Sequence, residues 1–318
     1  MKKIFIGFTL IIQFYGVAGS CWGKRGHEII ASTAARILEE KKGKKFLKQH
    51  EFDLGYYANV PDLIWRKTAS EIEPPQHYLD WTKDFESIFK TPMGLPLEFR
   101  DFKTQMGAKF DIHLGVVPYR IHGLSARCKS LAKSLLQKNP TNKVSEAQKK
   151  ASQGLQGPLL VCLGTLGHYT GDLSMPLHLS ENHDGQLTGQ KGVHVYFEAA
   201  LVDELDPDLK VEVMAQSLAS FEKTDLKKMN GDQAVRAMIN DSLNKVPDLL
   251  KLDKSTNRHD LTLAKNKFKS LIVERLVQGS ILTAVVWSEI LEGVNEFDEN
   301  HFYFFDGSPD YIFPGKEL

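Results

Sequence analysis

Histidines and carboxylates recur at a four-residue spacing in the largely apolar segment "GHYTGDLSMPLH". His168 and Asp172 are four positions apart, so a helix places both side chains on one face. We expect Pro176 to end that helix just before His178, because proline interrupts helical hydrogen bonding. Imidazole nitrogens and carboxylate oxygens are both zinc ligands. The segment therefore predicts three metal ligands that converge at one end of a helix.

Other segments offer further ligands of the same kinds. In "GVHVYFE", His194 and Glu198 are again four residues apart, on a second predicted helical turn. Upstream, "NVPDLIWR" contributes Asp62, "PQHYLDW" contributes His77, and His27 lies near the start of the mature chain. A single histidine–carboxylate pair is more often a hydrogen-bonded surface pair than a metal site. One zinc ion takes about four ligands, so five histidines and three carboxylates together favour more than one metal ion.

The order of these residues resembles the zinc-dependent phospholipase C and S1/P1 nuclease superfamily, and is closer to the S1/P1 nucleases. The family pattern is an N-terminal Trp, then His, Asp and His, then H-x3-D-x5-H, and finally H-x3-[DE]. All nine positions have a match: Trp22, His27, Asp62, His77, His168, Asp172, His178, His194 and Glu198. The resemblance runs from residue 22 to about residue 200, and the remaining helices fit the all-α fold of the family.

The resemblance implies three zinc ions per chain. The first would be held by Asp62, His77, His168 and Asp172. The second would be held by His178, His194 and Glu198. The third would be held by the amine and carbonyl of Trp22 together with His27 and Asp172. Asp172 would thus join two of the ions.

These metals imply hydrolysis of a phosphodiester by a metal-bound hydroxide. Three divalent ions and three carboxylates leave a surplus of positive charge, which attracts the substrate phosphate. We expect Asp62 and Asp172 to act in catalysis through the metals. Arg66, four residues after Asp62, would clamp a phosphate oxygen, although an exposed helix cation is the simpler interpretation.

The substrate class is less sharply indicated than the metals. The spacings from Trp22 to His27 and from Asp62 to His77 resemble the nucleases, and predict action on single-stranded DNA or RNA and on 3′-nucleotides. Glu198 and "LGHYTGDLSMPLH" look equally like the phospholipases, so hydrolysis of phospholipid headgroups is the alternative. A noncatalytic zinc-stabilised binding protein is a third hypothesis, and no stable protein partner is implied.

Two residues after His77 are candidates for substrate binding. Tyr78 can stack on a nucleobase and Asp80 can accept hydrogen bonds from its edge, as the corresponding residues of the nucleases do. The alternative interpretation is that Tyr78 is a core aromatic residue. His183 lies outside the family pattern, and we expect it not to be a ligand.

Residues 1–21 have the layout of a secretory signal peptide: two lysines, an apolar run from 4 to 18, and then small residues. The sequence therefore predicts an exported protein, periplasmic or secreted, with a mature domain over 22–318. Cleavage after Cys21 would make Trp22 the first residue and free its amine for zinc. Lipidation of Cys21 is the alternative.

Elsewhere the apolar residues recur every three or four positions, which predicts an all-α single domain of mostly long helices around a trinuclear zinc cleft. Segments 80–107 and 180–192 are rich in turn formers and are expected to be long loops. The 40 basic and 40 acidic residues become a net charge of −2 once Lys2 and Lys3 are removed with the leader, so a long basic surface for duplex nucleic acid is not expected. Cys128 and Cys162 are the only cysteines left that can pair.

Overall fold

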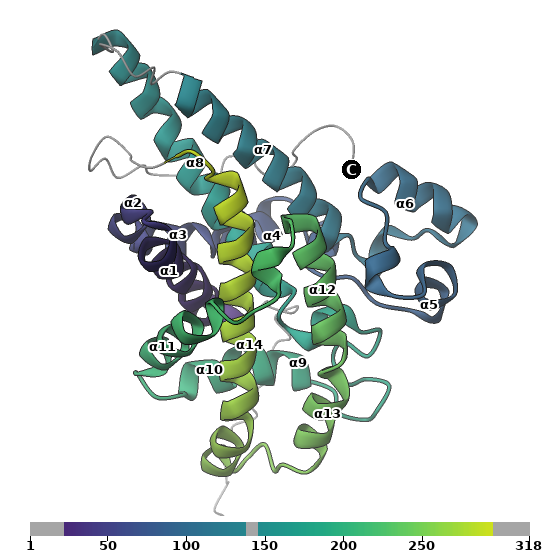
Figure 1. Ribbon diagram of the computed structural model, residues 1–318. Helices are drawn as coiled ribbons and strands as arrows, with labels where there is room; N and C mark the ends of the chain where they lie inside the picture. Colours follow the sequence, from purple (N-terminus) through teal and green to yellow (C-terminus); the bar gives the residue numbers. More distant parts are fainter. Residues whose placement is uncertain (1–21, 138–145, 295–318) are drawn as a thin grey trace, which may run out of the picture.

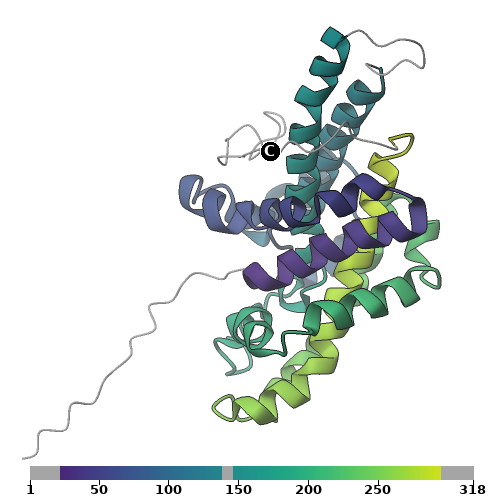
Figure 2. The same cartoon turned by 90° about the vertical axis from the view of Figure 1, so that its left-hand side faces the viewer.

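The computed structural model describes residues 22–137 and 146–294, with side chains described for 22–135 and 156–294. Within these ranges the regular elements are helices, and the β-type pairing is one isolated bridge between Trp81 and Ser180. The predicted all-α fold is confirmed. Helix α14 runs through the centre and packs against α1 and α8, while α7 and α8 run side by side and project beyond the shorter helices (Figures 1 and 2).

The α-helices have the following bounds: α1 Gly23–Lys42, α2 Lys45–Gln49, α3 Glu51–Tyr57, α4 Arg66–Thr68, α5 Lys83–Phe89, α6 Phe99–Met106, α7 Val117–Gln137, α8 Glu146–Asp172, α9 Val193–Val195, α10 Leu201–Glu204, α11 Leu209–Phe221, α12 Gly231–Leu243, α13 Val246–Lys254 and α14 Leu261–Ile290. Two π-helices cover Pro61–Trp65 and Tyr196–Ala200. Short 3₁₀ turns include Pro74–Gln76 and Pro176–Leu179.

Helix α14 is the central element of the core. From Leu271 to Trp287 it is buried on nearly all sides, and it packs against α1, α8, α11 and α12. By length and composition it would be able to cross a membrane, but 83% of its most apolar window is buried inside the protein. A helix that is apolar all round and covered by other helices is a core helix.

Helix α1 ends at Gly43, which adopts a left-handed conformation with φ 68°. The N–H of Gly43 donates to the Glu39 carbonyl, and the N–H of Lys44 donates to that of Leu38. A glycine tolerates this conformation without a Cβ clash. The turn directs the Lys44 ammonium to the end of α14, where it donates to the carbonyls of Leu291 and Val294. The first and last described helices are thereby joined at one end.

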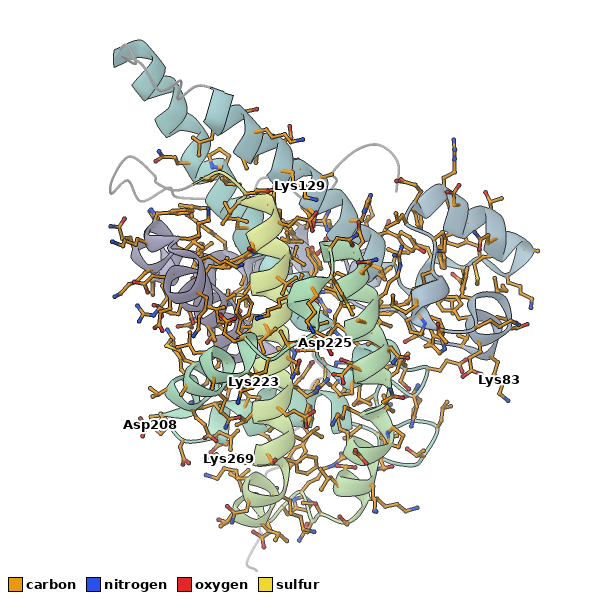
Figure 3. The ribbon with its side chains drawn as sticks, viewed as in Figure 1. Lys83, Lys129, Asp208, Lys223, Asp225 and Lys269 are labelled. Carbon is orange, nitrogen blue, oxygen red and sulfur yellow. A yellow bond between two sulfur atoms is a disulfide. The ribbon has the colours of Figure 1, made fainter. Side chains whose placement is uncertain are left out.

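Ion pairs on the surface also join helices. Lys129 on α7 contacts Glu289 on α14 at 2.5 Å, and Lys269 on α14 contacts Glu212 on α11 at 3.0 Å (Figure 3). These side chains are more than one third exposed, so each pair contributes under about 1 kcal/mol. The apolar core must supply most of the stability.

The expectation of a loop over 80–107 is wrong. This segment forms α5 and α6, whose phenylalanines pack on one another: Phe85, Phe89, Phe99 and Phe102. The Thr82 hydroxyl accepts from the N–H of Phe85 and caps α5. The turn formers lie between two short amphipathic helices rather than throughout the segment. Segment 180–192 consists of turns, as expected.

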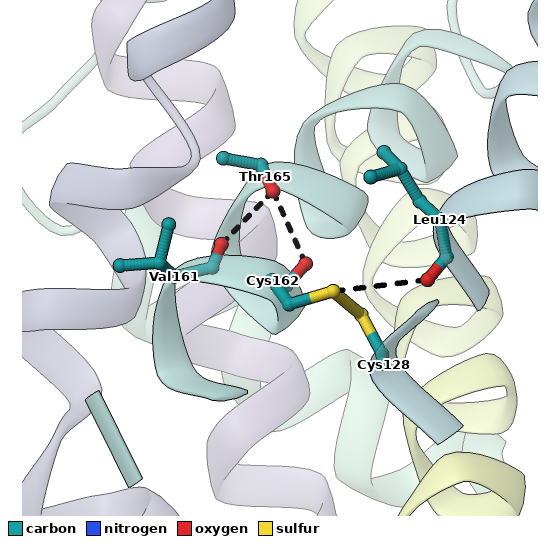
Figure 4. Close-up of a disulfide and its surroundings, with 5 residues drawn as sticks. All are labelled: Leu124, Cys128, Val161, Cys162 and Thr165. Carbon is teal, nitrogen blue, oxygen red and sulfur yellow. Dashed lines mark hydrogen bonds between the residues drawn. A yellow bond between two sulfur atoms is a disulfide. The ribbon is translucent and has the colours of Figure 1, made fainter. Parts of the chain in front are cut away.

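The two remaining cysteines form a disulfide. Cys128 on α7 is bonded to Cys162 on α8, and both side chains are buried (Figure 4). Next to it the Thr165 hydroxyl donates to the carbonyls of Val161 and Cys162. The bond therefore links α7 to α8 ahead of the last turns of α8, which carry His168 and Asp172.

Replacing both Cys128 and Cys162 by alanine should lower the free energy of unfolding by about 2–4 kcal/mol, because the bond closes a long loop in the unfolded chain. The sequence separation of the two cysteines is 34 residues. Urea unfolding of the wild type and the double variant measures the difference. Equal midpoints under oxidising conditions would show that the bond does not stabilise the fold.

Candidate metal centre

All nine family positions lie around one buried centre, although they come from separate parts of the chain. Eight of the side chains supply a nitrogen or oxygen that faces a neighbouring ligand. Six of the nine residues are 0% exposed: Trp22, His27, His77, His168, Asp172 and Glu198. His178 is 3% exposed, and the side chains of Asp62 and His194 are 10% and 13% exposed.

Asp172 lies between two sets of histidines. Its Oδ2 is 3.1 Å from His77 Nδ1 and 3.3 Å from His168 Nε2. Its Oδ1 is 3.4 Å from His27 Nε2 and 3.6 Å from His178 Nδ1. A tetrahedral ion with zinc-like bond lengths separates its ligands by about 3.4 Å. Each oxygen of Asp172 therefore faces a different set of nitrogens at the spacing that a metal ion requires.

The end of α8 differs from the prediction in one respect. The helix stops at Asp172, four residues before Pro176, and Pro176 opens a 3₁₀ turn that carries His178. The chain reverses through bonds from Ser174 N–H to the Gly171 carbonyl and from Met175 N–H to the Asp172 carbonyl. Proline thus starts the second ligand segment instead of ending the first.

Asp62 lies at the other side of the same histidines. Its Oδ1 is 3.8 Å from His77 Nδ1 and 3.9 Å from His168 Nε2, and Arg66 Nε contacts that oxygen at 2.9 Å. Asp62 belongs to the π-helix Pro61–Trp65, and such wide turns are frequent at functional sites. The arginine orients the carboxylate toward the histidines.

Glu198 collects the remaining ligands. Its Oε2 is 3.1 Å from His194 Nε2 and 3.5 Å from His178 Nε2. The expected helical turn is in fact α9 followed by a π-helix, but the four-residue spacing still brings His194 and Glu198 together. The Nδ1 of His194 lies 2.8 Å from the carbonyl of His183, so Nε2 is the nitrogen presented to the cluster. His183 contributes its main chain, not its ring.

Several of these buried atoms have no hydrogen-bond partner: His27 Nε2, His178 Nδ1, His194 Nε2 and both carboxylate oxygens of Glu198. A buried polar atom without a partner costs roughly 1–3 kcal/mol. Zinc ions would satisfy these atoms, and the donor set of imidazoles and carboxylates suits zinc. The residues present therefore fit the expected metal.

Among the residues that the structure describes, three groups are compact enough to hold an ion: His27 with Asp62 and His168, His77 with His168 and Asp172, and His178 with His194 and Glu198. The last group coincides with the second set that the resemblance implies. The other two groups share His168, so the first implied set is spread over both. The cluster is continuous, and distances alone do not divide it into three separate sites.

The protonation states suit metal binding. Burial lowers the pKa of His27 to about 3 and of His178 to about 4, and lowers the pKa of His77 and His168 well below the usual value. These imidazoles are neutral at pH 7 and keep a lone pair. Burial alone would raise the pKa of Glu198, but the contacts with His194 and His178 outweigh it and lower that pKa. Neutral imidazole and ionised carboxylate are the forms that bind zinc.

Trp22 is anchored beside Asp172. Its indole Nε1 donates to the Gly171 carbonyl and the Ser174 hydroxyl, both at 3.0 Å. Its carbonyl accepts the N–H of Gly26 at 3.2 Å, and a Cβ on Gly26 would lie only 3.0 Å from that of Trp22. The close turn explains a glycine there. Residues 1–21 lie outside the described residues, so the predicted free amine stays a prediction.

Arg25 fastens the first turn of α1 to the end of α10. Its guanidinium donates to four main-chain carbonyls, those of Val202, Asp203, Leu205 and Asp206, at 2.6 to 3.2 Å. The same turn of α1 carries His27, whose ring stacks on His168 at 3.9 Å. The arginine therefore helps to hold the first turn against the cluster.

Tyr78 and Asp80 are half-buried at the edge of the centre. Their segment is held beside the 3₁₀ turn, because Leu79 N–H donates to the His178 carbonyl and Trp81 N–H to that of Leu179. The Tyr78 hydroxyl donates to the His113 carbonyl. Burial, and next the charge of Glu181, raise the pKa of Asp80 to about 7. Tyr78 is thus not a fully enclosed core residue.

A groove of 590 Å³ is lined by the start of α5, by the segment before α7 and by Glu181: Thr82, Lys83, Asp84, Lys109, Asp111, Leu114 and Glu181. The segment that carries Tyr78 and Asp80 leads directly into it at Thr82. The lining carries both signs of charge, with Lys109 paired to Asp84 at 2.7 Å.

No role was predicted from the sequence for Glu73, whose carboxylate contacts the His77 nitrogen that faces away from the other ligands. Its Oε1 is 3.1 Å from His77 Nε2, and it accepts a hydrogen bond from the Tyr169 hydroxyl. Burial raises the pKa of Glu73 to about 7, although Arg120 opposes the shift. The sequence does contain an indication of this contact, because Glu73 precedes His77 by four residues, the spacing of the other histidine–carboxylate pairs. Two intervening prolines obscured it by excluding a regular helix.

A family model described as S1/P1 Nuclease matches residues 22–281 of this chain, a range that contains all nine positions. No curated protein matches the chain.

Without metal, the protein should lose stability as the pH falls from 6.5 toward 4. An unfolded histidine has a pKa of about 6.5, whereas the folded values for His27 and His178 are about 3 and about 4. In that window the unfolded chain binds protons that the folded chain does not. The free energy of unfolding should then fall by up to about 1.4 kcal/mol per histidine and pH unit.

Urea unfolding with chelator present, at pH 7.5 and pH 5.5, measures this loss. Above pH 6.5 these histidines should have no effect. Glu73 and Asp80, whose pKa is raised to about 7, oppose this change, because the folded chain binds their protons over the same window. The contribution of the histidines is therefore the part of the pH dependence that is lost in His27→Gln and His178→Gln. An unchanged pH dependence in these variants would contradict buried, neutral imidazoles.

Proposed function

The chain belongs to the S1/P1 nuclease family and is a hydrolase of the nuclease type, and we propose that it is an exported zinc enzyme that cleaves single-stranded DNA or RNA. The observation that carries the zinc proposal is Asp172, whose two buried oxygens face two different sets of imidazole nitrogens. A carboxylate in that position is suited to join two metal ions. 3′-Nucleotides would be further substrates.

We propose three zinc ions, held as the family resemblance implies. Asp62, His77, His168 and Asp172 would hold the first; His178, His194 and Glu198 the second; and Trp22, His27 and Asp172 the third. Bound zinc would supply an activated water near neutral pH and would polarise the phosphate oxygens. Six metal charges less three carboxylates leave +3, which favours a phosphodiester in a protein without a strong net charge.

The protein groups fix the geometry of this chemistry. Asp172 sets the spacing between the two histidine sets, and Arg66 holds Asp62 through its 2.9 Å contact. The Arg66 side chain is 19% exposed, so we propose that its guanidinium also contacts a phosphate oxygen of the substrate. A planar guanidinium is well suited to phosphate.

Tyr78 and Asp80 are proposed to bind the base of one nucleotide. Stacking of a base on an aromatic ring contributes about 1–3 kcal/mol and tolerates any sequence. The Asp80 carboxyl has a buried Oδ1 without a hydrogen-bond partner, and a base edge with N–H donors would satisfy it. The main-chain bonds to His178 and Leu179 keep this segment close to the metals.

The experiment that tests the function compares purified mature protein on single-stranded DNA, RNA and phosphatidylcholine vesicles, with zinc present. We expect turnover of the nucleic acids, loss of that turnover with chelator, and recovery on adding zinc. A baseless phosphodiester serves as control, since it needs the metals but not Tyr78. Faster turnover of the vesicles would favour a phospholipase C instead.

Asp172→Asn should reduce activity more than Glu198→Gln, because Asp172 is proposed to serve two ions and Glu198 one. The expected loss in kcat/KM for Asp172→Asn exceeds about 100-fold, which is the upper range for groups that only support a ligand. Activity on an oligonucleotide and zinc content by elemental analysis are measured together. Comparable losses, with zinc retained in both variants, would argue against the shared carboxylate.

We propose that the mature enzyme begins at Trp22 and that its amine is a zinc ligand. A free α-amine can lose its proton near neutral pH, whereas an amide nitrogen cannot coordinate so readily. A preparation that keeps one extra residue before Trp22 should bind about one zinc ion fewer. N-terminal sequencing of exported protein and zinc analysis of both forms check this. A lipidated Cys21, or full zinc content in the extended form, would remove Trp22 from the site.

A further inference from the structure

A buried row of polar side chains lies behind the metal centre and ends on one of its histidines. We propose that Glu73 is a positioning residue, which holds the proton of His77 on Nε2 and so keeps the Nδ1 lone pair directed at a metal ion. The inference rests on the proposed zinc site and adds to it a supporting carboxylate that is not one of the nine ligands.

The two nitrogens of His77 face different surroundings. Nδ1 lies 3.1 Å from Asp172 Oδ2 and 2.9 Å from His168 Nε2, inside the ligand cluster. Nε2 lies 3.1 Å from Glu73 Oε1, on the other side of the ring, which is an ion-pair distance without the angle of a hydrogen bond. A neutral imidazole carries one N–H, and the group at the outer nitrogen decides which nitrogen keeps it. A carboxylate at this distance favours the tautomer with its proton on Nε2, which leaves the Nδ1 lone pair for coordination.

His77 differs in this respect from two neighbouring ligands. The outer nitrogens of His168 and His194 contact main-chain carbonyls, those of Ala58 at 2.7 Å and His183 at 2.8 Å. Both of these rings present Nε2 to the cluster, whereas His77 presents Nδ1. The orientation of His77 thus depends on a side chain, which a substitution can remove.

Glu73 is itself firmly held. It is 0% exposed and accepts a hydrogen bond from the hydroxyl of Tyr169, the residue next to His168 on α8. Arg120 Nη2 donates to that hydroxyl at 3.3 Å. The Arg120 guanidinium is fully buried and stacks over the rings of Tyr169, at 4.9 Å, and Trp65, at 5.6 Å. Tyr169 therefore holds the Glu73 carboxylate by a hydrogen bond, and Arg120 in turn holds the Tyr169 hydroxyl.

The local chain geometry directs Glu73 toward the ring. Glu73 precedes the 3₁₀ turn Pro74–Gln76, and the N–H of His77 donates to the Pro74 carbonyl. Two prolines fix the backbone between the carboxylate and the histidine. This stiff turn keeps a four-residue contact without a regular helix.

A buried glutamate and arginine are a weak source of stability, because removal of both charges from water offsets their attraction. A carboxylate behind a metal-bound histidine, by contrast, fixes the ring and raises its basicity, and its loss typically weakens metal binding or activity 10–100-fold. The position of Glu73 between His77 and Tyr169 matches this second role.

The test compares zinc affinity, by competition with a chelator, in the wild type, Glu73→Ala, Glu73→Gln and Tyr169→Phe. We expect Glu73→Ala to bind one of its zinc ions about 10–100-fold more weakly. Glu73→Gln should lose less, because its amide oxygen can still accept the Nε2 proton. Tyr169→Phe should lose less than Glu73→Ala, because the carboxylate stays but its hydroxyl partner is gone.

Asp232→Asn is the matched control. Asp232 on α12 is also a carboxylate beside a histidine, with its Oδ1 2.9 Å from His122 Nδ1, but His122 is not one of the nine ligands. Its loss should change the free energy of unfolding of the metal-free protein without weakening zinc. The same unfolding measurement on the Glu73 variants separates a loss of fold from a loss of metal affinity.

Wild-type zinc affinity in Glu73→Ala, or in Glu73→Gln and Tyr169→Phe if the alanine variant does not fold, would overturn the positioning role alone. A wild type that binds no zinc would overturn the proposed metal centre as well. Weaker zinc binding with unchanged metal-free stability in Glu73→Gln would support the role.

Discussion

A carboxylate removed from water is stable only beside compensating charge or hydrogen-bond donors, and this requirement governs the centre of the protein. Asp172 and Glu198 are fully buried, and Asp62 nearly so. Four of the five imidazoles around them are kept neutral by burial and bring no positive charge of their own. Metal ions would supply the missing charge, and their binding would then stabilise the folded state.

The ligands keep their positions because their segments are fastened through the main chain. The Trp22 indole is bonded to the end of α8, and the rings of His168 and His194 contact carbonyls from other turns. The segment with Tyr78 is bonded to the turn with His178. A main-chain carbonyl or N–H is present whatever the side chain at that position. These contacts therefore depend on how the helices place the backbone and not on the residue types that supply the groups.

The sequence was sufficient to predict the helical class and the residues that gather at the centre. His168 and Asp172 are close because four residues make about one helical turn, a regularity that needs no knowledge of the rest of the chain. The helices α5 and α6 were missed because short helices owe their stability to packing, here among phenylalanines, more than to local propensity. Glu73 was missed because its contact with His77 is made across a proline turn. The wide turns at Asp62 and Glu198 also depend on packing.

The pairing of α1 with α14 has a consequence for how the chain acquires its structure. These are the first and last described helices, and Lys44 joins them again at one end. Ribosomes deliver the chain from its N-terminus, so α1 emerges long before the helix against which it packs. Contacts between such distant segments slow folding and leave apolar surface exposed in the meantime. The part of the centre contributed by Trp22 and His27 is therefore completed late, and a chain that stops before α14 would lack the helix that packs along α1.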